Sequence, residues 1–264
     1  MQLHFKELGR GEPLVMLHGL FGSGDNWLGV APKLADSFRV LLPDLRNHGQ
    51  SPHSDAMDYP LMAADLKRLL DGAGLAGVDL LGHSLGGKVA MQFALAFPKY
   101  VRRLVVVDMA PRRYTPEHEP IFEALLAMDL KTFESRREME ESLAPKFPDL
   151  ALRRFLLKNI GRHEDGSFFW KMNLRGLHQN YLKLGELISS PAPFRKPALF
   201  LRGGKSKYVS AADETLIRQL FPEVRFETIA HARHWVHADA PDEFIGHVKR
   251  FLGAAAIESG APAA

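Results

Sequence analysis

The sequence predicts an α/β fold in which helices flank a mostly parallel sheet. Short runs that are nearly continuous in apolar residues alternate with helical patterns along the chain, as is typical of parallel strands covered on both faces. Between residues 112 and 195 this alternation stops, and helical patterns dominate. We expect such an all-helical insertion between two strands to form a cap over the carboxyl edge of the sheet.

The pattern divides the chain as follows. Strands are expected at 13–19, 39–45, 78–84, 104–110, 197–203 and 224–230. Helices are expected at roughly 25–36, 57–73, 86–97, 210–221 and 241–253. The predicted domains are an α/β core at 1–111 and 196–253, a helical cap at 112–195, and a frayed C-terminal tail at 254–264.

Composition excludes several classes of protein. The 264 residues are 46% hydrophobic and 25% charged, with a net charge of +3 that is spread among mixed signs. This distribution argues against a nucleic-acid surface. The absence of cysteine excludes disulfides and thiolate metal sites. No apolar run reaches the length of a membrane span, and the first residues lack the features of a secretory signal. We therefore expect a cytoplasmic protein.

The segment "VDLLGHSLGGKVAMQFALAF" carries the strongest chemical signal. A strand runs into Gly82-His83-Ser84-Leu85-Gly86, and a helix follows at once. The pattern G-x-S-x-G in a strand–turn–helix setting indicates a nucleophile elbow, in which small flanking residues permit a tight turn. Ser84 is thus the candidate nucleophile, at the positive end of the following helix.

The same residues also fit a phosphate-binding loop. Gly82 through Lys88 match G-x-x-x-x-G-K, so a nucleotide-binding protein is an alternative from another class. The next residue is Val89, whereas a phosphate-binding loop needs Ser or Thr there to hold Mg²⁺. The elbow is therefore the favoured interpretation.

A second segment supports acyl transfer. "VMLHGLFGSGDNW" ends a strand and opens a glycine-rich loop. Acyl transfer needs two backbone N–H groups directed at the developing oxyanion. We expect one from Leu85, after the nucleophile, and the other from Leu20, with Phe21 as the neighbouring candidate.

The chain resembles the α/β-hydrolase superfamily over nearly its whole length. The resemblance rests on "HGLFGS", "DLRNHGQS", "GHSLGGKVA" and "HWVHADAP", in that order. It implies an α/β-hydrolase fold with a helical cap inserted after the sixth strand. In "DLRNHGQS" it implies that Asp44 and Arg46 brace the loops around the site. It also implies that the catalytic base stands seven residues before the proline that opens the last helix, and His234 has this spacing from Pro241.

The catalytic acid is missing from its usual place. The loop "GGKSKYV" (203–209), where such hydrolases often carry it, holds no carboxylate. Asp213 falls within the next helix. Asp108 ends the strand beyond the nucleophile strand, so it should lie at the same sheet edge and orient the imidazole. A structural reading of Asp108, in which it bonds the turn into Pro111, stays open.

This arrangement resembles one group within the superfamily, the YbfF-like esterases. "VDMAP", "GGKSKYVS" and "HWVHA" carry that resemblance. It implies that the acid has moved to the earlier strand and that Ser206 joins the site by hydrogen-bonding Asp108 or His234.

Together these observations predict a serine hydrolase of carboxylic esters. Ser84, His234, Asp108 and Ser206 are the catalytic candidates, and Leu20 and Leu85 are the candidates for the oxyanion hole. The resemblance implies small acyl esters and acyl-CoA thioesters as substrates, with no metal and no cofactor. The cap aromatics, such as Phe155 and Tyr181, would line a lipophilic pocket or form the cap's own core. A carbon–carbon bond hydrolase or an acyltransferase would use the same triad and remains open.

Overall fold

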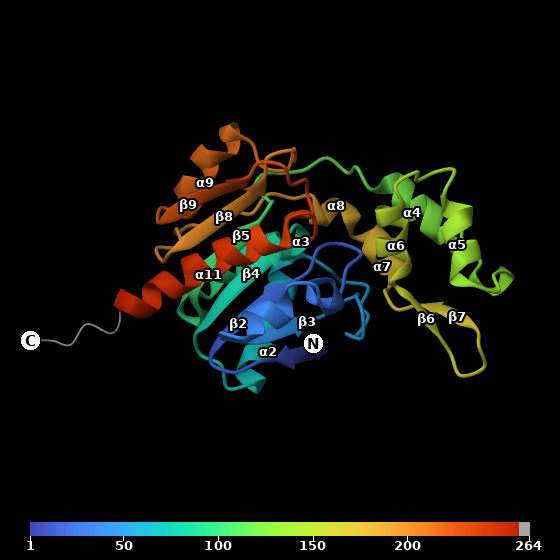
Figure 1. Cartoon of the computed structure of the whole chain (residues 1–264), viewed down its shortest axis with the longest axis horizontal. Coiled ribbons are helices and arrows are strands. Elements are labelled where there is room, and N and C mark those ends of the chain that lie inside the picture. The colour runs from blue at the N-terminus through green and yellow to red at the C-terminus, as the bar shows by residue number, and fades with distance from the viewer. Residues whose placement is uncertain (259–264) are drawn as a thin grey trace, which may run out of the picture.

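The computed structural model describes residues 1–258, with side chains described through residue 253. A seven-stranded sheet with the order β1-β3-β2-β4-β5-β8-β9 forms the centre of the molecule (Figure 1). Its strands are β1 (Phe5–Leu8), β2 (Glu12–Leu17), β3 (Phe38–Pro43), β4 (Val78–His83), β5 (Val101–Val107), β8 (Ala198–Gly203) and β9 (Val224–Ile229). Every neighbouring pair is parallel except β1 and β3, which are antiparallel.

The register of the sheet places the ends of its central strands together. His83 of β4 pairs with Val107 of β5, and Val107 pairs with Leu201 of β8. The residues that follow β4 and β5, Ser84 and Asp108, therefore emerge side by side at one edge. Both strands are buried almost throughout, because helices cover both faces of the sheet.

Helices cover the sheet in two layers. The core of one face contains residues of α1 and α11, and the core of the other contains residues of α2, α3 and α9. The helices and helical turns outside the cap are η1 (Gly24–Trp27), α1 (Ala31–Ala35), α2 (Tyr59–Gly72), α3 (Leu85–Ala96), η2 (Pro98–Tyr100), η4 (Ala211–Asp213), α9 (Glu214–Leu220), α10 (Val236–Asp239) and α11 (Pro241–Glu258). Among the described residues, no helix has both the length and the apolar character that crossing a bilayer requires.

The segment between β5 and β8 forms a cap beside the sheet (Figure 1). Its elements are α4 (Glu119–Leu126), η3 (Leu130–Thr132), α5 (Arg136–Leu143), α6 (Leu150–Leu157), β6 (Ile160–Arg162), β7 (Phe168–Trp170), α7 (Leu174–Gln179) and α8 (Tyr181–Leu184). Buried cap side chains such as Phe122 and Leu177 belong to the same hydrophobic cluster as the α2–α3 face of the core. The cap is thus packed onto the core through apolar contacts.

The expectation of an all-helical cap is wrong in one place. β6 and β7 pair as an antiparallel hairpin. Its turn contains Gly166 at φ +89°, a conformation that favours glycine. The Asp165-Gly166 pair shortly before the aromatic run 168–170 is the sequence signal for this turn.

Three other boundaries differ from prediction. Five strands precede the cap within the described residues, so it follows the fifth strand of this chain and not the sixth. The sequence pattern does not indicate the first strand, β1, because β1 is a largely exposed edge strand and lacks the apolar run of a buried strand. The helix expected at 25–36 is split into η1 and α1 around Gly29. The last helix continues to Glu258, past the predicted start of the tail, and 259–264 lie outside the described residues.

Candidate active site

The turn between β4 and α3 raises Ser84 from the backbone. Ser84 adopts φ 54° and ψ −118°, a strained conformation for a residue with a side chain, of the kind that costs about 1–3 kcal/mol. A Cβ on Gly82 would lie 2.1 Å from the carbonyl oxygen of Gly86, and one on Gly86 would lie 2.4 Å from that of Leu17. Only glycine fits at both positions: Gly82 because of the backbone of the turn itself, and Gly86 because of the adjacent end of β2.

The loop after β2 lies directly against the nucleophile. A Cβ added to Gly19 would be 3.3 Å from Ser84 Cβ, so glycine permits this approach. Buried His18 fixes the loop, since its Nδ1 donates to the Gly19 carbonyl at 2.8 Å and its Nε2 accepts from the Leu45 amide at 3.0 Å. Burial lowers the pKa of His18, which keeps the ring in the neutral form that this pairing requires.

Leu20 and Leu85 lie on either side of Ser84 at the wall of one cavity. Leu85 is the first residue of α3, and the first N–H groups of a helix have no partner within the helix. Phe21, the neighbouring candidate, adopts φ 59° and is buried against Phe122. The arrangement is compatible with an oxyanion site formed by the Leu20 and Leu85 amides.

Asp44 and Arg46 brace the loops, as expected. Asp44 Oδ1 accepts from the Gly24 amide at 2.7 Å, and its Oδ2 accepts from the Gln50 amide at 2.8 Å. Arg46 pairs with buried Asp65 at 2.7 Å. Neither side chain lines the two cavities that contain Ser84.

Asp108 lies one residue beyond β5 and is 1% exposed. Its Oδ2 is 2.7 Å from His234 Nδ1 and also accepts a hydrogen bond from Ser206 Oγ. Its Oδ1 accepts from the Gly203 amide at 3.1 Å. The carboxylate is thus held by three donors, one of which is the imidazole that it would orient.

The loop 203–209 reaches this site because it starts with two glycines. A Cβ on Gly203 would lie 2.3 Å from the carbonyl oxygen of Arg233, and one on Gly204 would lie 2.4 Å from that of Ala230. The loop therefore packs directly on the segment that carries His234. This contact places Ser206 beside Asp108.

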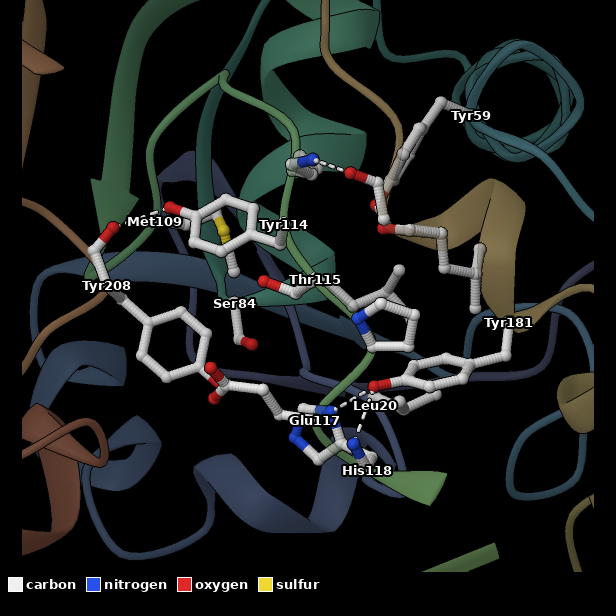
Figure 2. Close-up of a pocket in the computed structure, with 15 residues that line it drawn as sticks. Leu20, Tyr59, Ser84, Met109, Tyr114, Thr115, Glu117, His118, Tyr181 and Tyr208 are labelled. Carbon is white, nitrogen blue, oxygen red and sulfur yellow. Dashed lines mark hydrogen bonds between the residues drawn. The ribbon is translucent and has the colours of Figure 1, made fainter.

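Sequence reasoning missed Tyr208. Its ring stacks on the His234 ring, with centroids 3.8 Å apart and planes 17° apart. Its amide donates to Ser206 Oγ at 3.2 Å, and its carbonyl accepts from the Tyr114 hydroxyl at 2.5 Å (Figure 2). No motif marks this tyrosine, because its role depends on a loop and a strand end that are remote in the sequence.

The loop that follows β9 carries three histidines, and their surroundings differ. The His234 carbonyl accepts from His83 Nε2 at 2.9 Å, which anchors the loop to the elbow. His237 is buried against Trp27, and His231 is exposed near Glu243. Arg233, which replaces a frequent glycine, is tied to the carboxylate of Asp239 at the surface.

Two cavities meet at Ser84. A cleft of about 660 Å³ extends between core and cap, and both Ser84 and His234 line it. A narrower cavity of about 70 Å³ is lined by Ser84, Tyr114 and Tyr181 (Figure 2). The described structure contains no hydrogen bond between Ser84 Oγ and His234; such contacts often tighten only when substrate binds.

Most aromatic residues of the cap do not line a cavity at Ser84. Of the eight phenylalanine, tyrosine and tryptophan residues at 122–181 that could do so, Phe155 lines the wide cleft and Tyr181 lines the narrow cavity. Phe122 is fully buried in the hydrophobic cluster. The remaining members, Phe133, Phe147, Phe168, Phe169 and Trp170, line neither of these two cavities.

Comparison with known proteins agrees with this architecture. The family described as alpha/beta hydrolase fold matches residues 12–140. The mouse sn-1-specific diacylglycerol lipase ABHD11 is 40% identical over 247 residues, which cover 90% of this chain and 80% of the lipase. Esterase YbfF of Escherichia coli K12 is 35% identical over 241 residues, which cover 91% of this chain and 92% of the esterase.

A solved structure extends the likeness to three dimensions. The structure titled "Marine microorganism esterase" has a TM-score of 0.92 and 43% identity, and the match covers 95% of this chain and 99% of that one. The nucleotide-binding alternative explains none of these matches. The chain belongs to the α/β-hydrolase family.

Proposed function

We propose that the protein hydrolyses carboxylic esters through an acyl-enzyme on Ser84, with His234 as general base and Asp108 as its orienting acid. The observation that carries this proposal is the buried Asp108 carboxylate, 2.7 Å from His234 Nδ1 at the sheet edge where the elbow presents Ser84. The named relatives support the reaction class, because they include a lipase and two esterases.

The imidazole geometry determines the direction of proton transfer. Nδ1 faces a carboxylate and therefore carries a proton, which leaves Nε2 free to accept one. Ser84 Oγ attacks the acyl carbon while its proton passes to His234 Nε2. The electron pair of the carbonyl moves to its oxygen, where the Leu20 and Leu85 amides would stabilise the negative charge. Collapse of this intermediate expels the alcohol, which takes the proton from His234.

The second half of the cycle repeats these steps with water. Water gives a proton to His234 Nε2 and attacks the acyl carbon of the acyl-enzyme. Collapse of the second oxyanion breaks the bond to Ser84 Oγ, which regains its proton, and the carboxylic acid leaves. Asp108 stabilises the imidazolium in both halves, and Ser206 supports Asp108.

The two cavities support a proposal about the acyl chain length of the substrate. Short to medium acyl chains match a site with one narrow and one wide compartment, and thioesters would react by the same steps. The cap, 112–195, supplies walls to both compartments and so would act as a substrate-binding lobe on the core. A cytoplasmic location stays a prediction, and fractionation of expressing cells tests it.

Labelling with a fluorophosphonate probe tests the nucleophile. Wild type should be labelled and should hydrolyse p-nitrophenyl butyrate, whereas Ser84→Ala should lose both properties, with kcat lower by about 10⁶-fold as for other serine nucleophiles. The exposed Ser210, outside both cavities, provides the matched control Ser210→Ala. Retention of label in Ser84→Ala, or a wild type that releases no free carboxylic acid from the ester, would contradict the proposal.

A further inference from the structure

Lys88 is a buried cation that the proposed mechanism does not use. It lies on α3, one turn beyond the nucleophile, and its amide donates to the Ser84 carbonyl at 3.1 Å. The residue is 1% exposed, yet it lines the same narrow cavity as Ser84. A lysine is almost never fully buried unless its charge has a partner.

The contacts of the ammonium leave its charge without a carboxylate. Nζ donates to the backbone carbonyls of Gly185 and Glu186 in the segment that returns from the cap. It also lies 4.9 Å from the ring centre of Tyr114 and 5.5 Å from that of Tyr59. An ammonium has three N–H donors, and the described carbonyl contacts occupy two of them.

The surrounding charges compensate for this burial only in part. Burial has the largest effect on the pKa of Lys88, Arg112 and Arg113 lower it further, and Glu186, whose carboxylate is engaged by Arg113 at 2.6 Å, raises it. The net result is a pKa of Lys88 lowered to about 7. A bound anion would supply the missing opposite charge and stabilise the cationic form.

The shape of the cavity indicates where such an anion would belong. The cavity is lined by apolar residues such as Leu85, Met109 and Leu184, and by one carboxylate, that of the exposed Glu117. One helical turn advances about 5.4 Å along the axis, so a short methylene chain on the Ser84 side can reach toward the ammonium. The wide cleft, which Ser84 also lines, remains available for the alcohol part of the ester.

We propose that Lys88 forms an anion-binding subsite at the inner end of the narrow cavity and selects esters whose short acyl chain ends in a second carboxylate. The ligand class is thus the half ester of a short dicarboxylic acid. This inference rests on the proposed ester hydrolysis at Ser84.

Paired substrates test this selectivity. Monoethyl glutarate and ethyl 4-carbamoylbutyrate have nearly the same size, but only the first ends in a carboxylate. Wild type should prefer the half ester in kcat/KM by about tenfold or more, as expected for a hydrogen bond to a charged group. Half esters of succinate and adipate then define the length of the subsite.

Variants assign the preference to Lys88. Lys88→Met, which keeps the volume but removes the charge, should reduce the ratio of the two kcat/KM values to near one. Lys207→Met, at an exposed lysine of the loop 203–209, is the matched control and should keep the wild-type ratio. Free glutarate should inhibit hydrolysis of the neutral ester competitively in wild type.

The outcomes separate two failures. A wild type that hydrolyses both esters without preference, or a Lys88→Met variant that loses activity on both in the same proportion, overturns the subsite and assigns Lys88 to holding the 185–186 backbone. A wild type that hydrolyses neither these nor p-nitrophenyl esters overturns the proposed function instead. If Lys88→Met does not fold, the wild-type ratio and the glutarate inhibition decide.

Discussion

The elbow at Ser84 and the loop 203–209 both shape the site, but their geometry has different origins. In the elbow, Gly82 is required by the nearby backbone of Gly86 and Gly87, whereas Gly86 is required by the carbonyls of Leu17 and His18 at the end of β2. In the loop, Gly203 and Gly204 are both required by contact with residues 230–233. The elbow still shows in one pentapeptide, whereas the loop has no such motif and its contacts join segments that only folding brings together.

This difference is the reason that the sequence marks Ser84 more plainly than Asp108. Asp108 acquires its role from the pairing of β5 with β4 and β8, from the Gly203 amide, and from the His234 ring. Three predictions concern side chains that reach the site through contacts between distant segments: Asp108, Ser206 and Tyr208.

Asp108→Asn is expected to have the largest effect. The amide can offer an N–H to His234 Nδ1 and so favour the wrong tautomer, which lowers kcat by about 10⁴-fold in a triad of the trypsin type. The measurement is kcat on a p-nitrophenyl ester, after circular dichroism confirms that the variant folds.

Asp213→Asn provides the control for this prediction. Buried Asp213 pairs with Arg112 at 3.0 Å and with Ser210. It lines neither cavity that contains Ser84, so we expect its variant to keep a kcat close to that of wild type once folding is confirmed. An inactive Asp213→Asn variant together with an active Asp108→Asn variant would show that Asp108 is not the catalytic acid.

Ser206→Ala is expected to have an intermediate effect. The hydroxyl donates to the Asp108 carboxylate, and hydrogen bonds to charged groups contribute about 1.5–3 kcal/mol, so kcat should fall by about tenfold or more but far less than in Asp108→Asn. Ser206→Thr keeps the hydroxyl and should recover most of the rate. Equal losses in the alanine and threonine variants would assign the effect to packing and not to the hydrogen bond.

Tyr208→Leu is expected to have the smallest effect. Stacking of an aromatic ring on the imidazole contributes about 0.5–1.5 kcal/mol, so the loss of the ring should lower kcat about three- to tenfold with little change in KM. Tyr208→Phe keeps the stacked ring and should resemble wild type.

The pH profile of kcat/KM separates positioning by Tyr208 from general stability. A loss of rate in Tyr208→Leu that has the same size at every pH would show that the imidazole is less well positioned and not that the fold is less stable. If Tyr208→Leu leaves kcat unchanged, the stacking does not contribute to catalysis.

The parts of the site that the sequence predicted share one property. The motif around Ser84, the spacing of His234 from Pro241 and the end of the β5 strand at Asp108 each show in a short stretch of residues. The groups that were missed, Tyr208 and the buried charge of Lys88, have roles that depend on neighbours from other elements. In the sequence, Lys88 stands out only as part of a phosphate-loop pattern, which does not indicate what its side chain contacts.

The sequence by itself determined the alternation of strands and helices and the strand–turn–helix setting of Ser84, because apolar periodicity acts over a few residues. Only the tertiary structure decided that the cap contains the β6–β7 hairpin, that the loop 203–209 supports Asp108 and His234, and that Lys88 faces the cavity beside Ser84. These features depend on strand register and on packing between distant segments, which a one-dimensional pattern does not specify.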